Sequence, residues 1–458
     1  MKKIVMFGVA ALALTSCSQE ELLTDRQANG ADGLISFRAR TGKTTRAQDL
    51  TSDNLTSFMV YGYKGTPEMD FDKYVEANGA GGEEPVEMTE YFGWEEFTKD
   101  DVTGYFNSEK DYYYPVDNSF LIFPCYAPAS VKGVEALNTG GIKFNNFTVA
   151  DNIEEQVDLV ADIVNCMRWS DSAYGASVAF EHMLSKVYVA GAKNTNDSYN
   201  YQVAGVKFGN IHKSGNGRYM VSSEMPAEEE DKNPAYDYVN AGSYPVVWTF
   251  SDDEPADELS VIFETPVTIK EEETDLMGGF DSTGSFMMIP QQLVHSVSEG
   301  TEEAESPTLE MKSGVAYIAL LLRITDTEGN VVYPFDQGVD NISEIIGDGE
   351  NASKFAWAVF PIASRWSASH ITTYTIDFTH GAGYVAPGAE GYYDAFFEDE
   401  KIDLEYKPIL GGKVYFIETE SDVRNWDNTD IDWTNETNSQ KYTVSVDVAD
   451  EEDPFGGE

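Results

Sequence analysis

The sequence has few of the residues on which metal and thiol chemistry depend. It contains three cysteines and five histidines in 458 residues, and the histidines form no His-Glu-x-x-His pair or other zinc-binding spacing. No Gly-x-Ser-x-Gly nucleophile elbow occurs. The many carboxylates do not indicate a glycosidase, because that chemistry depends on how far apart two carboxylates lie in space. We therefore expect no enzyme, and we assign no catalytic, cofactor-binding or metal-binding residues.

Basic residues are also scarce. Lys and Arg number 30 against 80 Asp and Glu, so the formal net charge is −50. A surface this negative repels phosphate backbones and anionic lipid headgroups, so we expect no nucleic-acid partner. The chain is nevertheless 41% apolar and 13% aromatic, too rich in these residues for a disordered protein.

Long apolar runs are missing after the N-terminus. Lys2 and Lys3 precede a run from Ile4 to Leu14, which is too short to span a bilayer. It ends in Leu14-Thr15-Ser16-Cys17, which resembles the lipobox of bacterial lipoproteins. We therefore predict a signal peptide over residues 1–16, lipidation of Cys17 and anchoring in the outer membrane. The alternative is an ordinary secretory signal with a chance cysteine.

Beyond Cys17, only Cys125 and Cys166 remain. An exported compartment permits a disulfide between them. Two buried free thiols are the alternative, because the sequence does not reveal the Cα separation.

The informative segments alternate apolar and polar residues, as β-strands do. They are rich in β-branched and aromatic residues and are bounded by Gly, Asn, Asp or Pro, and they lie at 58–63, 119–123, 186–190, 315–320, 374–378 and 413–417. Many short strands indicate an all-β fold of sandwiches or barrels. Residues 158–162 are considered as one helical turn. The polar, acidic stretch 222–258 indicates a linker or surface loops, so we place a domain boundary near 225.

The segment "RARTGKTTRAQD" (38–49) is basic in an acidic chain. Its Gly-Lys-Thr is the end of a phosphate-binding loop, but that motif needs Gly where this chain has Phe37. The polar residues that follow, 48–54, also provide no apolar helix for a phosphate. We therefore reject a nucleotide site.

Several segments follow one another in a recognisable order. A lipobox is followed by the acidic "SQEE", the strand-like "GLISFRAR" and then "TRA", and the series continues with "FMVYGY" (58–63), "DYYYPVDNSFLIFPCYAP" (111–128), "VAFEHMLSKVYVAGAKN" (178–194), "FMMIPQQL" (286–293), "WAVFPI" (357–362) and "VYFIETESDVRNWD" (414–427). This order along the whole chain resembles the fimbrillin family, the FimA- and Mfa-type pilins of Bacteroidetes. "SQEE" is itself similar to an export tag that sends such lipoproteins to the cell surface.

This resemblance implies two tandem transthyretin-like β-sandwich domains with Greek-key type connections. We accordingly expect a lipidated propeptide over 17–46, an N-terminal domain over 47–225 and a C-terminal domain over 226–458. In the stalk pilins, a protease cuts after an Arg and removes the N-terminal strand, and a neighbouring subunit fills the groove with a strand of its own. Arg46, followed by Ala47, matches that cleavage position, and Arg40 is the alternative. A further alternative is that this linker is never cut.

The residues themselves favour two exchangeable strands. Ile35, Phe37 and Ala39 alternate with polar residues in the N-terminal strand 33–40, so removing it would leave an apolar groove and unpaired backbone groups. The candidate donor is segment 441–449, in which the apolar positions are Tyr442, Val444, Val446 and Val448. The alternative is that this segment completes the C-terminal sandwich of its own chain.

We therefore expect a structural or adhesive pilin subunit at the cell surface, with other pilin subunits as partners and a host glycan or protein as receptor. The alternative is a non-polymerising surface lipoprotein: a tip adhesin, an anchor subunit or a glycan-binding protein. In the last case, exposed aromatics would stack on sugars, the candidates being Trp94, Trp169, Trp366, Trp426 and Trp433.

Overall fold

The computed structural model of the chain describes residues 33–40, 50, 54–69, 73–74, 88–168, 175–219, 246–251, 255–272, 274–277, 285–294, 308–309, 314–335, 343–386, 408–411, 414–422 and 439–444. Within these ranges the secondary structure is almost entirely β, with a short 3-10 helix at Gly349–Asn351. This confirms the all-β prediction. The division into two tandem transthyretin-like sandwiches stays a prediction.

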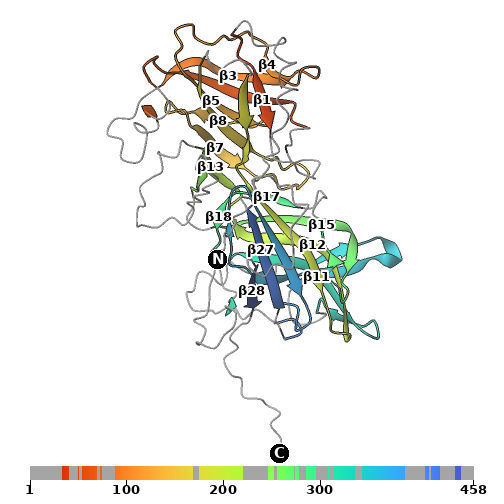
Figure 1. Cartoon of the computed structure of the whole chain (residues 1–458). Helices are drawn as coiled ribbons and strands as arrows, with labels where there is room; N and C mark the ends of the chain where they lie inside the picture. The colour runs from red at the N-terminus through yellow and green to blue at the C-terminus, as the bar shows by residue number, and fades with distance from the viewer. Residues whose placement is uncertain are drawn as a thin grey trace, which may run out of the picture.

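The first part of the chain forms an eight-stranded sheet in the order β10-β8-β5-β2-β3-β4-β1-β9. Its strands, seen at one end of the molecule in Figure 1, are β1 (Phe37–Arg40), β2 (Ser57–Lys64), β3 (Thr89–Lys99), β4 (Phe106–Ser108), β5 (Leu121–Ala127), β8 (Val160–Met167), β9 (Ala176–Ala179) and β10 (Glu181–His182). Strands β9 and β10 lie at opposite ends of this order, but only Phe180 separates them in the chain. The sheet therefore curls so that its two ends come together. The curled sheet encloses a core of its own, in which Phe37, Phe58 and Phe123 are buried.

A four-stranded sheet joins this part of the chain to the rest, in the order β14-β13-β7-β6. It combines early and later segments, namely β6 (Val134–Ala136), β7 (Ile142–Thr148), β13 (Ser214–Tyr219) and β14 (Val246–Thr249). In Figure 1, β7 and β13 lie between the two ends of the molecule.

The later part of the chain forms two seven-stranded sheets. The first has the order β16-β11-β25-β27-β28-β19, and β17 also pairs with β11. Its strands are β11 (Ser185–Lys193), β16 (Thr274–Asp275), β17 (Phe286–Met288), β19 (Thr308–Leu309), β25 (His370–Asp377), β27 (Val414–Asp422) and β28 (Ser439–Val444). The second runs β15-β12-β20-β23-β22, with β21 paired to β20 and β26 to β23, and comprises β12 (Tyr199–Ile211), β15 (Asp257–Thr268), β20 (Tyr317–Asp326), β21 (Val331–Tyr333), β22 (Ser343–Ile346), β23 (Ser353–Pro361) and β26 (Tyr384–Val385). Two short strands, β18 (Gln291–Gln292) and β24 (Arg365–Trp366), pair separately.

The larger core is continuous between the two parts of the chain. It includes Tyr63 and Ile122 on the outer face of the curled sheet, Trp248 of the four-stranded sheet, and Phe208 and Trp366 of the later sheets. The Phe208 ring contacts the Trp366 ring edge-on, with the ring centroids 5.6 Å apart. The outer face of the curled sheet is therefore covered over β2, β5 and β8.

Two local predictions differ from the structure, while the domain boundary near 225 stays a prediction. Strand β11, which begins at Ser185, already pairs with later strands, whereas β13 and β14, on either side of residue 225, pair with β7 and with each other. Residues 160–162, predicted as part of a helical turn, begin strand β8, because Val160 and Ala161 pack into opposite cores as strand neighbours do. The stretch 222–258, predicted as linker or loop, contains the buried strand β14. Among the described helical residues, no segment is both long enough and apolar enough to cross a membrane.

We expect Trp248→Ala to lower the free energy of unfolding by about 3–5 kcal/mol, since the side chain is fully buried. Its indole N–H also donates a 2.9 Å hydrogen bond to the carbonyl of Met183. Denaturant unfolding followed by circular dichroism measures the loss. The matched control is Trp94→Ala, a half-buried tryptophan that should cost less. Equal losses of unfolding free energy for the two variants would contradict the expectation that the buried Trp248 contributes more to stability than the half-buried Trp94.

Candidate functional site: the slot of the first strand

Residues 33–40 lie between two other segments of the curled sheet, and we call their position the slot. On one side, Leu34 pairs with Tyr113 and Phe37 with Phe106, both antiparallel. The N–H of Ile35 donates to the carbonyl of Tyr112 at 2.7 Å, and the N–H of Tyr114 donates to the carbonyl of Gly33 at 2.8 Å. We call residues 106–114 of this side the first wall.

On the other side, β1 runs parallel to β9, which we call the second wall. The pairs extend from Phe37 with Ala176 to Arg40 with Ala179. The N–H of Ala176 also donates to the carbonyl of Ser36 at 2.9 Å. Segment 33–40 is therefore an internal strand with neighbours on both edges, as the N-terminal strand prediction requires.

The apolar side chains of the strand point into the core of the curled sheet. Ile35 and Phe37 are fully buried, and Ala39 packs against the same core. The Phe37 ring makes edge-to-face contacts with Phe58, Phe97 and Phe123, whose ring centroids lie 5.8, 4.9 and 5.2 Å away. Such contacts stabilise by about 0.5–1.5 kcal/mol each beyond the burial of area. The predicted alternation of Ile35, Phe37 and Ala39 matches this arrangement.

Arg38 lies on the opposite face of the strand. Its guanidinium stacks on the ring of Tyr105, with Cζ 4.4 Å from the ring centroid, and it donates a hydrogen bond to the Tyr105 hydroxyl. This cation–π contact adds a polar interaction to the apolar ones on the inner face. The first basic residue of "RARTGKTTRAQD" thus has a structural role.

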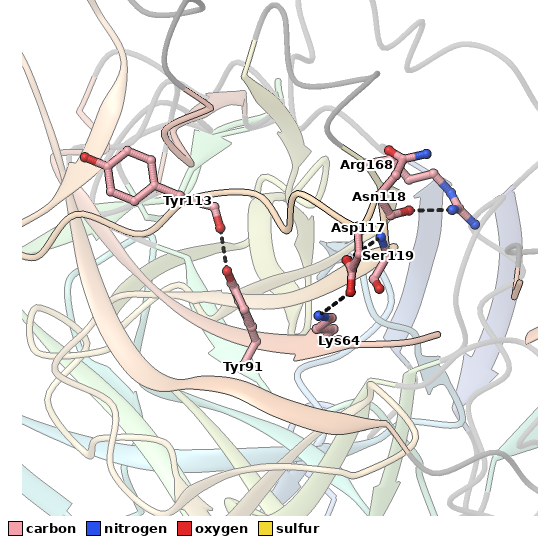
Figure 2. Close-up of polar contacts among 7 residues, drawn as sticks. All are labelled: Lys64, Tyr91, Tyr113, Asp117, Asn118, Ser119 and Arg168. Atoms are coloured by element: carbon pink, nitrogen blue, oxygen red, sulfur yellow. Dashed lines mark hydrogen bonds and ion pairs between the residues drawn. The ribbon is translucent and has the colours of Figure 1, made fainter. Parts of the chain in front are cut away.

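The first wall and the turn after it are held by residues that do not belong to the strand (Figure 2). The Tyr91 hydroxyl donates to the carbonyl of Tyr113 at 2.5 Å. Arg168 Nη1 donates to the carbonyl of Asn118 at 2.6 Å, and Lys64 Nζ lies 3.0 Å from Asp117 Oδ2. The turn after the wall is therefore fixed from β2, β3 and the end of β8.

A second group of contacts holds the wall at Tyr112. Its hydroxyl donates to Glu95 Oε1 at 2.7 Å, and Lys110 Nζ lies 2.5 Å from the same oxygen. The hydrogen bond from Lys110 lowers the pKa of Glu95, so this carboxylate stays ionised in mildly acidic solution.

Asp162 fixes the second wall. Its Oδ2 accepts a hydrogen bond from the N–H of Ala179 at 2.7 Å, and its Oδ1 accepts one from the N–H of Ile163 at 2.8 Å. Because Asp162 lies on β8, this carboxylate ties β9 to a strand other than β1. Both walls thus have contacts that do not depend on segment 33–40.

The predicted processing site itself lies outside the described residues, with Arg46 and Ala47 in the stretch 41–49. Residues on both sides of it are placed. Arg40 ends β1, and the N–H of Leu50 donates to Asp158 Oδ2 at 2.9 Å. Asp158 Oδ1 lies 2.8 Å from His182 Nδ1, and both side chains are fully buried. His182 is thus a buried, hydrogen-bonded residue of strand β10.

The C-terminal candidate strand completes a sheet of its own chain. Residues Val414–Thr419 of β27 pair antiparallel with β28, and β19 pairs parallel with its last two residues, Thr443 and Val444. This is the alternative stated for segment 441–449. Tyr442 and Val444 belong to β28, while Val446 and Val448 lie outside the described residues, as does Cys17.

The strand register excludes a disulfide between Cys125 and Cys166 in this fold. Cys125 lies opposite Asp162, four residues along β8 from Cys166. At about 3.3 Å per residue this is roughly 13 Å, beyond the reach of a disulfide. Cys125 is a free, fully buried thiol whose burial raises its pKa.

Two of the candidate sugar-stacking tryptophans can be placed. Trp366 is fully buried and cannot stack on a sugar, because its ring packs against Phe208. Trp94 is half-buried against Tyr61 and Tyr126, while Trp169, Trp426 and Trp433 lie outside the described residues. Among the described residues, no group of His, Cys, Asp or Glu is arranged to hold a metal ion.

Sequence reasoning missed the residues that hold the walls. No sequence motif marks the residues that make these contacts, namely Tyr91, Asp117, Asp162 and Arg168. Each of them forms a hydrogen bond with a residue at least two positions away in the chain. One signal was available: "YYYPVDNS" combines turn residues with tyrosines, which favours an ordered turn next to a strand.

Comparisons with known proteins found no matching family model and no matching curated protein. Solved structures similar to this chain are fimbrial and putative cell adhesion proteins from Bacteroidetes. A fimbrial protein from Bacteroides vulgatus is 13% identical, with a TM-score of 0.43 over 75% of this chain and 94% of that one. A putative cell adhesion protein from Bacteroides uniformis is 14% identical, with a TM-score of 0.34 over 76% and 93%. The tip fimbrial protein Mfa3 from Porphyromonas gingivalis, with a C-terminal truncation, is 10% identical, with a TM-score of 0.25 over 75% and 95%.

We expect Phe37→Ala to lower the free energy of unfolding by about 3–5 kcal/mol, because it removes a fully buried ring from four-ring packing. Ser177→Ala is the matched control, since Ser177 lies on the second wall with an exposed side chain. Urea titration compares the two. A Phe37→Ala protein as stable as the Ser177→Ala protein would show that the slot is not part of the folding core.

Asp117 predicts a pH dependence. Hydrogen bonds from Ser119, through its N–H and its hydroxyl, and from Lys64 lower the pKa of Asp117 from 3.8 to about 2. A lowered folded-state pKa stabilises the fold above the ordinary pKa, and the contribution is lost as pH falls toward the folded value. The melting temperature of Asp117→Asn should therefore lie below that of the wild type above about pH 5 and converge with it near pH 2. Scanning calorimetry at several pH values tests this, and a constant difference would contradict it.

Proposed function

We propose that the chain is a fimbrial-type subunit of the cell surface with a structural or adhesive role, assembled by strand exchange after proteolysis. One observation carries the proposal. Segment 33–40 is an internal strand that fills the apolar core of the curled sheet, while both of its walls are held by residues outside it. Such a strand can be removed without dismantling the site that holds it.

The processing step in this proposal is a cut after Arg46, with Arg40 as the alternative. Release of residues 17–46 removes Ile35, Phe37 and Ala39 from the core. The rings of Phe58, Phe97 and Phe123 then line an apolar groove, and the N–H and C=O groups of both walls lose their partners. Unpaired strand edges beside an apolar groove are a template for another strand. The subunit thereby gains a binding site for a neighbour.

Before the cut, the lipid on Cys17 would hold the protein at the outer membrane. After the cut, the lipidated segment and the body of the protein are separate chains. The expected partners are therefore the membrane through the anchor and other subunits through the slot. A host glycan or protein receptor belongs to the adhesive role, and no described residue is assigned to it.

The alternative role is that of a surface lipoprotein that does not polymerise with its own copies: a tip adhesin, an anchor or a glycan-binding protein. The pairing of β28 on both edges favours it, because a strand held in its own sheet is not available to a neighbour. In that case the chain accepts a strand but donates none.

Limited digestion with an arginine-specific protease tests the processing step. We expect a cut after Arg46 and none after Arg38 or Arg40, because these two residues lie within the paired strand. N-terminal sequencing should then yield Ala47, and the same residue should begin the protein recovered from cells. Arg46→Gln should abolish the cut, whereas Arg40→Gln should leave it unchanged. A cell-derived protein that begins only at Cys17 would contradict the processing proposal.

We also expect the cut strand to stay in place until another strand displaces it. Burial of Ile35 and Phe37 stabilises it by roughly 3–6 kcal/mol, in addition to the hydrogen bonds to both walls. Size-exclusion chromatography of the nicked protein should therefore recover fragment 17–46 with the body in native buffer and separately in denaturant. A fragment lost at once in native buffer would contradict this expectation.

A further inference from the structure

The slot is most selective at the position of Phe37. This side chain is fully buried, and three phenylalanine rings contact it edge-on from β2, β3 and β5. Ile35 fills a closed apolar position two residues before it, and the half-buried Ala39 lies two residues after it. A strand seated here must therefore present an aromatic ring at the centre, a branched aliphatic side chain on one side and a small residue on the other.

The C-terminal segment of this chain does not fit that pattern. Its alternate apolar residues after β28 begins are Tyr442, Val444, Val446 and Val448. A valine at the Phe37 position leaves a cavity among the three rings. Tyr442 at that position buries its hydroxyl beside Phe58, Phe97 and Phe123, whose side chains offer no hydrogen-bond acceptor.

The remaining C-terminal aromatic fits no better. Phe455 has Asp453 two residues before it and Gly457 two residues after it. In either direction, the Ile35 position would receive a carboxylate or no side chain at all. A buried unpaired carboxylate is strongly unfavourable.

The backbone of the C-terminal strand is also engaged elsewhere. β28 pairs with β27 from Ser439 to Val444, and β19 covers the other edge at Thr443 and Val444. A second copy would have to withdraw this strand from its own sheet before donating it. The poor fit of its side chains and the pairing of its backbone thus both argue against the C-terminal strand as the occupant of the slot.

We propose that the vacated slot accepts a strand from a different protein, one with an aromatic side chain at the Phe37 position, and rejects the C-terminal strand of a second copy. This inference rests on the proposed function, since it concerns the slot after its own strand has been cut. The partner is identified by chemistry: an extended segment of the form aliphatic-x-aromatic-x-small. The chain then joins a mixed assembly and does not form a polymer of its own copies.

Peptide exchange on the nicked full-length protein tests the proposal. The protein cut after Arg46 is incubated with an excess of one of four fluorescent peptides, and incorporation is measured after size-exclusion chromatography. The first pair is segment 33–40 and its Phe37→Val variant. The second pair is segment 440–449 and its Val446→Phe, Val448→Ala variant, which places an aromatic after Val444 and a small residue after the aromatic, at the spacing of Ile35, Phe37 and Ala39. All variants are in the peptides, so folding of the protein is unaffected.

We expect segment 33–40 to be incorporated and its Phe37→Val variant to be incorporated at least about tenfold less. Segment 440–449 should behave like the Phe37→Val variant, and the combined Val446→Phe, Val448→Ala change should restore its incorporation. Incorporation of unmodified 440–449 as efficiently as 33–40 would overturn the inference while supporting strand exchange. A nicked protein that takes up none of the four peptides would overturn strand exchange itself, and the inference with it.

Discussion

The structure of the first half of the chain depends on the packing of one ring, that of Phe37, against three others. These rings come from β2, β3 and β5, and Phe37 reaches them from β1, between the walls. The curled sheet therefore has an aromatic interior completed by strand β1. Interiors pack at nearly crystalline density, so an empty place at this position is unfavourable and a wrongly shaped side chain is not easily accommodated.

The two walls of the slot are held by contacts that do not involve the Phe37 ring. The first wall is held by Tyr91, Lys64 and Arg168 and the second by the carboxylate of Asp162, none of which belongs to the first strand. The energy that positions the slot is thus separate from the energy that fills it. A preorganised site of this kind loses little conformational entropy when a strand binds. The same arrangement explains how segment 33–40 can be both central to packing and removable.

Alternation in the sequence was sufficient to predict the all-β class and the buried face of 33–40, because period-two burial is a local property of a strand. The boundary near 225 stays a prediction, because a local pattern does not reveal that β13 and β14 return to the four-stranded sheet after β11 and β12 have joined the later sheets. The sequence also could not decide whether Cys125 and Cys166 form a disulfide, because their separation depends on the register between β5 and β8. The residues that hold the walls were missed for the same reason: their partners are distant in sequence.

One feature of the curled sheet bears on mechanical load. Among the described strands, β9 pairs within its sheet only with β1, so the slot is the seam between β9 and the other strands, which is crossed by the hydrogen bond from Ala179 to Asp162 of β8. A strand from a neighbour that occupies this seam lies lengthwise between two hydrogen-bonded edges. Tension along the strand then acts in shear on all of those bonds together, whereas tension across it would open them one at a time. A junction built on this seam is suited to a fibre that is pulled along its axis.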